Sequence, residues 1–258
     1  MREILNVQGL TKTFRLSPKQ QKLERTKEKV RVAVKDLSFS AYEGEIFGLL
    51  GPNGAGKTTT LRMLSTLIRP DSGDALVDGA SVVREPEKVR CRIGFLTSEL
   101  KLEEFFTPNY LFDFFSDLHK VDRSLREERK KKLFQRFSID KFAEVKVADL
   151  STGMKQKVSL VVSIVHDPDI IIFDEPTNGL DVLTAKVVTD FLEELKRQGK
   201  TIIVSTHIFS LIEKLCDRVG IIINGEMVVC DALERVKDGE SLEDRFFRIY
   251  QERAGEDQ

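Results

Sequence analysis

The sequence predicts an α/β fold in which a mostly parallel sheet carries an inserted helical lobe. Apolar runs at residues 45–50, 170–173 and 201–205 have the length and composition of buried strands. Amphipathic segments alternate with these runs, an order typical of parallel sheets covered by helices. The pattern is interrupted at residues 107–149, where phenylalanines and dense charge replace β-branched runs. We expect this stretch to form helices inserted into the α/β core.

The remaining elements follow from the same periodicities. Helices are predicted at residues 58–67, 158–165, 184–197 and 241–251, and further strands at residues 4–7, 30–39, 75–77, 81–83 and 92–96. The polar stretch 16–29 lies between two predicted strands and is rich in lysine, arginine and glutamine. We interpret it as a solvated hairpin tip, with contact to an acidic lipid or a partner as the alternative.

Composition limits the classes of function. Lys+Arg number 41 and Asp+Glu 42, which gives a net charge of -1, so no global field favours nucleic acid. The three cysteines match no metal-binding or redox spacing, as expected in a reducing cytosol. No apolar run approaches the roughly 18 residues that span a bilayer, and the first residues lack a signal-peptide core. Work on a membrane would therefore require docking to another chain.

A complete phosphate-loop pattern, G-x-x-x-x-G-K-[ST], follows the strand predicted at residues 45–50. Glycines let the backbone turn tightly and point its N–H groups at phosphates, and the following helix adds its positive dipole end. Lys57 is the expected cation for the β- and γ-phosphates, and Thr58 offers a hydroxyl to Mg²⁺. The predicted nucleotide-binding residues of the loop are Gly51, Pro52, Asn53, Gly54, Ala55, Gly56, Lys57, Thr58 and Thr59.

Two carboxylates end the buried strand predicted at residues 170–173. Asp174 stands where P-loop enzymes hold Mg²⁺, and Glu175 could polarise a water for attack on the γ-phosphate. A solvated strand end would explain the pair alone, but the phosphate loop upstream favours a catalytic role.

Several further motifs occur in a fixed order. The segment Leu150-Ser151-Thr152-Gly153-Met154-Lys155-Gln156-Lys157 resembles the LSGGQ signature of ABC ATPases. Asn178-Gly179-Leu180-Asp181 resembles the D-loop, His207 the switch histidine, and Phe14 the aromatic residue that stacks on adenine. The resemblance to the ABC transporter ATP-binding subunits runs from about Leu5 to about Ala232.

The resemblance implies a P-loop NTPase core with an N-terminal antiparallel β subdomain and an inserted α-helical subdomain. It implies a single domain over residues 1–258, with a core at 1–96 and 158–235, a helical subdomain at 97–157 and a C-terminal helix at 236–258. It also implies ATP and Mg²⁺ as cofactors. Ser151, Gly153 and Asp181 would contact ATP held by the other subunit of a head-to-tail homodimer or heterodimer, and Glu175, His207 and Lys57 would carry out catalysis.

An integral membrane permease is the partner that the family implies, and nucleic acid is not. The chain is then expected in the cytoplasm, peripheral to the inner face of the cell membrane. The helical lobe should expose a groove for the permease, lined by residues 99–106 and 110–115. The alternative is that those phenylalanines fill the core of the lobe. His119 and His166 are interpreted as structural.

The sequence departs from the family in two places. The usual glutamine after the strand at residues 92–96 is absent, and Ser98 stands in its place as a predicted metal ligand, with Glu99 as the alternative. The signature has Thr152 and Met154 where glycine and glutamine are usual. Backbone N–H groups of a helix start do not depend on the side chain, so we still expect ATP hydrolysis.

The form of the signature, the stretch at residues 93–99 and the lysine-rich hairpin resemble ATPase subunits of bacterial exporters of the sodium-exporting NatA type. Two other classes of protein also have a phosphate loop and an acidic strand end. A soluble ABC ATPase acting on nucleic acid or ribosomes commonly has tandem domains or zinc knuckles, and a small-molecule P-loop kinase would leave the signature, D-loop and His207 unexplained. The sequence of this chain does not identify the transported substrate.

Overall fold

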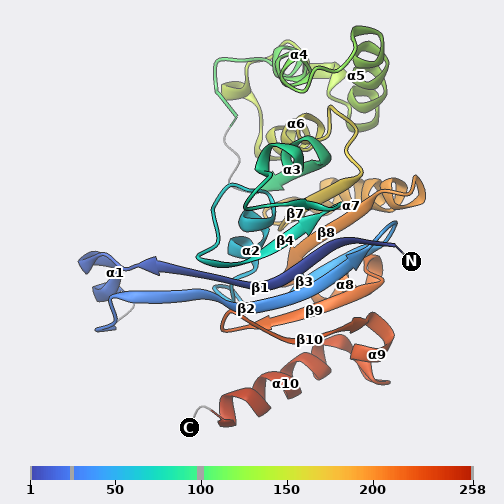
Figure 1. Cartoon of the computed structure of the whole chain (residues 1–258). Helices are drawn as coiled ribbons and strands as arrows, with labels where there is room; N and C mark the ends of the chain where they lie inside the picture. Colours follow the sequence, from blue (N-terminus) through green and yellow to red (C-terminus); the bar gives the residue numbers. More distant parts are fainter. Residues whose placement is uncertain (1, 24–25, 98–101, 257–258) are drawn as a thin grey trace.

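The computed structural model describes residues 2–23, 26–97 and 102–256, which form two sheets, their covering helices and a helical lobe (Figure 1). The larger sheet has the strand order β10-β9-β3-β8-β7-β6. Its strands are β3 (Ile46–Leu50), β6 (Ile93–Thr97), β7 (Ile170–Asp174), β8 (Thr201–Thr206), β9 (Arg218–Ile223) and β10 (Glu226–Ala232). All neighbours pair in parallel except β10, which is antiparallel to β9. The predicted α/β class is confirmed.

The smaller sheet is antiparallel with the order β2-β1-β4-β5. Its strands are β1 (Glu3–Arg15), β2 (Val30–Tyr42), β4 (Ser72–Val77) and β5 (Ala80–Ser81). β1 and β2 are joined as a hairpin whose tip carries the short helix α1 (Pro18–Leu23), with no buried side chain. The hairpin prediction is confirmed, but β1 is much longer than the strand predicted at residues 4–7. The prediction was too short because register shifts after Val7 disrupt the alternation of apolar and polar residues.

Helices cover both faces of the larger sheet, as parallel strands require. They are α2 (Lys57–Leu64), α3 (Pro86–Arg92), α7 (Val182–Arg197), α8 (Phe209–Leu215), α9 (Leu233–Lys237) and α10 (Leu242–Glu256). The predicted helices at 58–67, 184–197 and 241–251 are confirmed within a few residues. The strand predicted at 81–83 is wrong beyond Ser81, because the chain turns at Val82, whose N–H donates to Ala75 O at 2.9 Å.

The lobe contains α4 (Pro108–Leu118), α5 (Arg123–Phe137), two short 3-10 turns at Asp140–Phe142 and Val147–Asp149, and α6 (Thr152–Ser163). Side chains of Thr107, Asp122 and Ser151 accept N–H bonds at the starts of α4, α5 and α6. The prediction of helices without strands in this stretch is confirmed. α6 runs back from the lobe onto the sheet.

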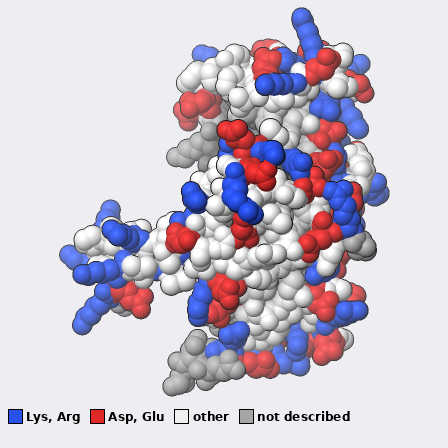
Figure 2. All heavy atoms as spheres, in the orientation of Figure 1, with Lys and Arg blue, Asp and Glu red and all other residues white. Residues whose placement is uncertain are grey.

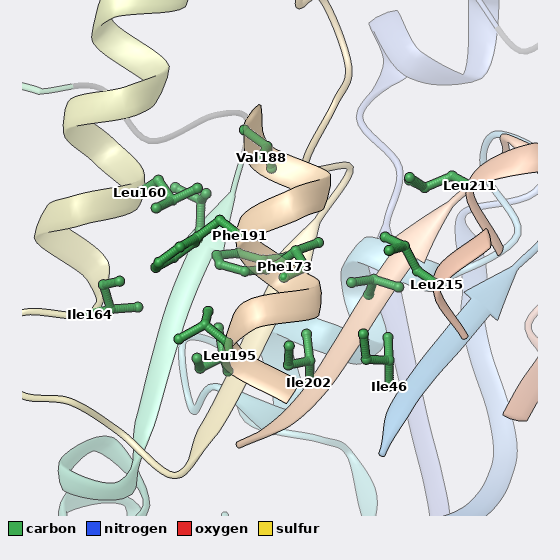
Figure 3. Close-up of a cluster of buried hydrophobic side chains, with 14 of the residues drawn as sticks. Ile46, Leu160, Ile164, Phe173, Val188, Phe191, Leu195, Ile202, Leu211 and Leu215 are labelled. Atoms are coloured by element: carbon green, nitrogen blue, oxygen red, sulfur yellow. The ribbon is translucent and has the colours of Figure 1, made fainter. Parts of the chain in front are cut away.

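One hydrophobic cluster joins the lobe to the sheet. Phe173 and Ile202 on the sheet face Phe191 and Leu195 of α7, with Leu160 of α6 beside them (Figure 3). Phe137 of α5 meets the Phe191 ring edge-on, with centroids 4.9 Å apart. The position of α6 and α7 relative to the strand ends is therefore fixed by packing. Within the described part of the chain, no helix has both the length and the apolar character needed to cross a membrane.

Candidate nucleotide site

The phosphate loop joins β3 to α2. Gly56 has φ +106°, and a β-carbon there would lie 2.4 Å from Ala33 O. At Gly51 a β-carbon would lie 2.3 Å from Ile222 O. Side chains at these two positions would collide with backbone, so glycine is required for the loop to take this path.

The loop surrounds a polar pocket of about 330 Å³ that opens at the carboxyl ends of the parallel strands. In open α/β sheets, ligands bind at this edge. Its lining comes from the loop and from three residues far along the chain: Asn53, Gly54, Ala55, Gly56, Lys57, Thr58, Thr59, Glu175, Asn178 and His207. The fold thus brings together most of the predicted loop and all three predicted catalytic side chains, Lys57, Glu175 and His207.

Lys57 is buried at the start of α2, with only 5% of its surface exposed. Its Nζ donates to Gly51 O at 2.7 Å and Pro52 O at 3.2 Å. Burial lowers the pKa of Lys57, and the nearby charges of Glu175 and Asp174 oppose that shift. The ammonium is thereby held at the pocket with donors that can turn to phosphate oxygens.

Asp174 ends β7 and is almost fully buried. Its Oδ1 accepts hydrogen bonds from Thr58 Oγ1 at 3.1 Å and from Ser205 Oγ at 2.5 Å. The Thr58 hydroxyl and the Asp174 carboxylate are hard oxygen ligands, as Mg²⁺ prefers. Among the described residues, no group of three or more histidine, cysteine or acidic side chains could hold a metal. A divalent ion here would complete its shell with phosphate and water oxygens, as is usual for Mg²⁺ with nucleotides.

Glu175 follows directly and has an unusual backbone. Its φ is +53°, in the left-handed region that glutamate rarely adopts. Its N–H donates to Ser205 O at 3.1 Å, and its Oε1 lies 3.1 Å from His207 Nδ1 and 3.7 Å from Lys57 Nζ. The strained backbone turns the carboxylate into the pocket between a cation and an imidazole. Strain of this kind gathers at functional sites.

The signature segment lies elsewhere. The Ser151 hydroxyl accepts from Met154 N–H at 3.3 Å and so begins α6, as predicted. Gly153, in the first turn, lies beside Asp181, which caps α7 through Leu183 and Thr184 N–H, each 3.0 Å from Oδ1. Hydrogen bonding by Thr184 lowers the pKa of Asp181. Ser151, Gly153 and Asp181 do not line the phosphate-loop pocket of their own chain.

Phe14 lies near the end of β1, with 41% of its surface exposed. It is opposite Arg31 on β2, and the Arg31 guanidinium donates to Gly54 O at 3.4 Å. Lys12 Nζ lies 5.8 Å from the centroid of the Phe14 ring, and Phe14 does not line the pocket, so its stacking on adenine stays a prediction.

The Ser205 hydroxyl donates to Asp174, and Ser205 was not predicted as a site residue, although a polar residue at the end of an apolar strand is a signal for one. Asn178 lines the pocket and was predicted only as part of the D-loop segment. Ser98 and Glu99 lie outside the described residues, so the metal role predicted for Ser98 stays a prediction.

Comparison with known proteins places this site in a family. The protein-family model described as "ABC transporter" matches residues 34–178. The chain is 41% identical over 219 residues to the ABC transporter ATP-binding protein NatA of Bacillus subtilis, covering 84% of this chain and 89% of the relative. It is 36% identical over 198 residues to the Nod factor export ATP-binding protein I of Burkholderia lata, covering 77% and 65%.

A solved structure of an ATP-binding subunit of an ABC transporter superposes with a TM-score of 0.83 at 26% identity, covering 96% of this chain and 99% of that chain. The chain belongs to the ABC transporter family and is an ATP-binding, ATP-hydrolysing subunit of it. The resemblance predicted from the motifs is confirmed, and the small-molecule kinase alternative is excluded.

Proposed function

We propose that this chain is the ATPase of a bacterial exporter and drives a separate membrane permease by closing and opening a nucleotide-dependent dimer. The observation that carries the proposal is the cluster of Lys57, Glu175 and His207 at the phosphate loop, with Asp174 bonded to Thr58 beside it. In this arrangement a cation, a carboxylate and an imidazole all border the space that a γ-phosphate would enter.

Glu175 is proposed as the general base. A water between its carboxylate and the γ-phosphate would lose a proton to Oε1 as it attacks phosphorus, and the bond from that phosphorus to the β–γ bridging oxygen would break to release ADP. Lys57 would balance charge on the phosphoryl oxygens, and His207 would orient the water or bond the γ-phosphate. The 3.1 Å approach of His207 Nδ1 to Glu175 Oε1 keeps the two side chains aligned for that work.

Thr58 and Asp174 are the proposed Mg²⁺ residues, with Ser98 a further candidate. When bound, the ion neutralises charge between the β- and γ-phosphates. The Ser205 hydroxyl, which donates to Asp174 Oδ1, would fix the orientation of that carboxylate. Phe14 is proposed to stack on adenine.

The signature is proposed to act on a second protomer. Ser151 and Gly153 present a helix start that does not border the pocket of their own chain, so a phosphate for it must come from outside. Val182 and Leu183, next to Asp181, are 85% and 78% exposed. Apolar side chains this exposed are suited to burial in a closed dimer. ATP between two such protomers would form contacts that exist only in the closed state.

The permease is proposed to dock where the lobe meets the core. An apolar groove of about 290 Å³ lies there, lined in part by Leu67, Phe95 and Phe115. Among the predicted lining residues that the structure describes, only Phe115 borders this groove. Phe106, just before α4, and Tyr110 and Phe114 on that helix stack in a row, and the last two are nearly half exposed. Phe112 is fully buried. One face of α4 therefore fills the core of the lobe, and the other face is proposed for docking. The lobe at 97–157 would then transmit closure from the core at 1–96 and 158–235.

Export is proposed because one relative is named for it, the Nod factor export ATP-binding protein. The chain would act in the cytoplasm, bound at the inner face of the cell membrane. Sodium is one candidate cargo and drugs are another.

The test is a pull-down of tagged Glu175→Gln protein from detergent-solubilised native membranes in Mg-ATP, followed by mass spectrometry. This variant removes the base but keeps the contacts of the nucleotide, so the closed complex should persist. A multi-span membrane protein at near-equal amount is expected. Recovery of ribosomes or nucleic acid instead would assign the chain to the soluble ABC class.

Turnover provides the chemical control. Lys57→Ala and Glu175→Gln should each lower ATP hydrolysis by about 100-fold or more, since one removes a phosphate contact and the other the base. Lys57→Ala should also lose nucleotide binding, whereas Glu175→Gln should keep it. Equal turnover by both variants and the parent protein, measured with the permease present, would disprove the assignment.

A further inference from the structure

The described parts of the hairpin, residues 15–23 and 26–31, are here called the basic prong and project from the body of the molecule (Figures 1 and 2). They hold six basic residues, Arg15, Lys19, Lys22, Lys27, Lys29 and Arg31, against one acidic residue, Glu28. Lys19, Lys22, Lys27 and Lys29 are exposed, and none of these four forms an ion pair with a carboxylate in the described part of the chain. So much unpaired charge on a projection calls for an anionic partner.

The base of the prong is fixed beside the nucleotide site. Arg31 pairs with Phe14 across the hairpin and donates to Gly54 O of the phosphate loop at 3.4 Å. The rest of the prong projects from the end of the molecule that carries the phosphate loop, where the parallel strands β3 and β8 finish (Figure 1).

An acidic counterpart lies beside the signature. Glu103, Glu104 and Asp149, here called the acidic strip, are all exposed. The Ala148 N–H donates to Glu104 O at 2.9 Å, which holds the two segments together. Asp149 is two residues before Ser151, so the strip borders the start of α6.

The charge of the strip is only partly balanced nearby. Lys146 is exposed in the same segment and offsets one of the three carboxylates. Glu103, Glu104 and Asp149 form no ion pair within the described residues. The strip therefore remains acidic, as a partner for a basic projection requires.

We propose that the basic prong of one protomer grips the acidic strip of a second copy of this chain in the ATP-bound dimer. The inference rests on the proposed head-to-tail dimer, in which the phosphate loop of each copy faces the signature of the other. The prong is beside the loop and the strip beside the signature, so the two oppositely charged surfaces meet. A two-fold axis repeats the contact, and each dimer has two such grips.

A second copy fits the prong better than a membrane surface does. Anionic lipids would also attract it. The prong, however, projects from the end of the molecule that carries the phosphate loop, which the proposed closed dimer would cover. The grip adds little affinity per charge pair but steers the two copies together from a distance, and salt screens it.

The test measures the dissociation constant of the dimer by sedimentation velocity, using the Glu175→Gln chain in Mg-ATP at about 50 mM and about 300 mM salt. The prong variant adds Lys19→Glu and Lys22→Glu. The strip variant adds Glu103→Lys and Glu104→Lys, and the control adds Lys120→Glu and Lys131→Glu on the lobe, where both lysines are exposed. Binding of a fluorescent ATP analogue to each monomer checks that the fold and pocket are intact.

At low salt the prong and strip variants should each weaken the dimer about 10-fold, because each alters several surface pairs per dimer. Combining all four substitutions in one chain should restore affinity to within about 3-fold of the parent, and the control should stay within that range. High salt should reduce every difference.

Two outcomes overturn the inference alone: a prong variant that dimerises like the parent, or a combined variant that does not recover. Binding of the chain to vesicles with anionic lipid, lost in the prong variant while dimerisation is unchanged, would assign the prong to the membrane instead. If the parent Glu175→Gln chain forms no dimer in Mg-ATP, the proposed head-to-tail dimer is wrong, and so is the proposed contact between the prong and the strip.

Discussion

Gly153 lies in the first turn of α6, where a small side chain would fit. A β-carbon there would meet Thr184 Oγ1 at 3.6 Å, an ordinary contact, in contrast to the backbone collisions at Gly51 and Gly56. Nothing within its own chain requires glycine at this position. A requirement for glycine would therefore have to come from a ligand or a partner.

Gly153→Ala separates these possibilities. Alanine is favoured over glycine inside helices, so the free energy of unfolding should rise or stay level, by up to about 1 kcal/mol. If a partner's ATP packs on this turn, hydrolysis and dimerisation should fall at the same time. Urea denaturation and turnover are measured on one preparation. Full activity in the variant would contradict the proposed contact.

Gly56→Ala is the matched change in the phosphate loop. Its φ of +106° and the 2.4 Å approach to Ala33 O leave no place for a methyl group. The loop must move, so we expect loss of nucleotide binding together with a drop in stability of about 1–3 kcal/mol. Normal binding of ATP by this variant would show that the loop adapts.

At the scale of elements, the groove between lobe and core can be tested without disturbing the nucleotide. Leu67 lines the groove and is 60% exposed, so Leu67→Glu should leave the fold and ATP binding intact. It should abolish stimulation of the ATPase by the permease, because a charge would be buried on docking. Leu125→Glu on α5, at a position 45% exposed, is the control. Equal loss in both variants would argue against this docking site.

His119 and His166 stack across the same junction, with ring centroids 3.9 Å apart. His119 ends α4, and His166 follows α6, with Nε2 bonded to Ile93 O at 3.0 Å. Burial lowers the pKa of both, that of His166 to about 4 with the charge of His119 adding to the shift. Arg129 lowers and Asp167 raises the pKa of His166 by smaller amounts.

As pH falls below about 6.5, the unfolded chain gains a proton at His166 that the folded chain does not take up until about pH 4. Stability should therefore decline over this window, by less than about 1.4 kcal/mol per pH unit from His166, and the lowered pKa of His119 acts in the same direction. His119→Phe combined with His166→Gln should flatten the decline in denaturation curves at pH 7.5, 6 and 5, as rough steps across that window. An unchanged slope would place the acid sensitivity elsewhere.

For the whole molecule, the shared hydrophobic cluster predicts one cooperative unit. Phe137 of the lobe is 1% exposed and contacts Phe191 of α7. Phe137→Ala should lower the free energy of unfolding by about 3–5 kcal/mol, and hydrogen exchange should accelerate in β7 and β8 as well as in the lobe. Acceleration confined to the lobe would show two independently stable units.

Much of the fold was predictable because its signals are local. The phosphate loop, the strand ending in Asp174 and the helices of the lobe each carry their pattern within a few residues. The full length of β1 was not predictable. The polar residues Thr11, Lys12 and Thr13 give no strand pattern, and only pairing with β2 and β4 keeps them in the strand. The strands β9 and β10 and the helix α8 were not predicted either.

The candidate site was predictable as a set of residue types and not as an arrangement. Lys57 and His207 are 150 residues apart, and only the order of the parallel strands brings them to one pocket. The His119–His166 stack and the division of the lobe phenylalanines between core and surface depend on which helix face turns inward. Sequence periodicity at a charge-dense, aromatic helix leaves that choice open.

The left-handed backbone of Glu175 has an evolutionary consequence. Glutamate at φ +53° gives up roughly 1 kcal/mol that glycine or asparagine would recover. Selection for thermostability alone would therefore drift toward those residues, and with Glu175 as the proposed base the resulting protein would be better folded but unable to hydrolyse ATP. On that assignment, only selection for turnover would keep glutamate at position 175, and the stability lost there measures how strongly activity has been maintained.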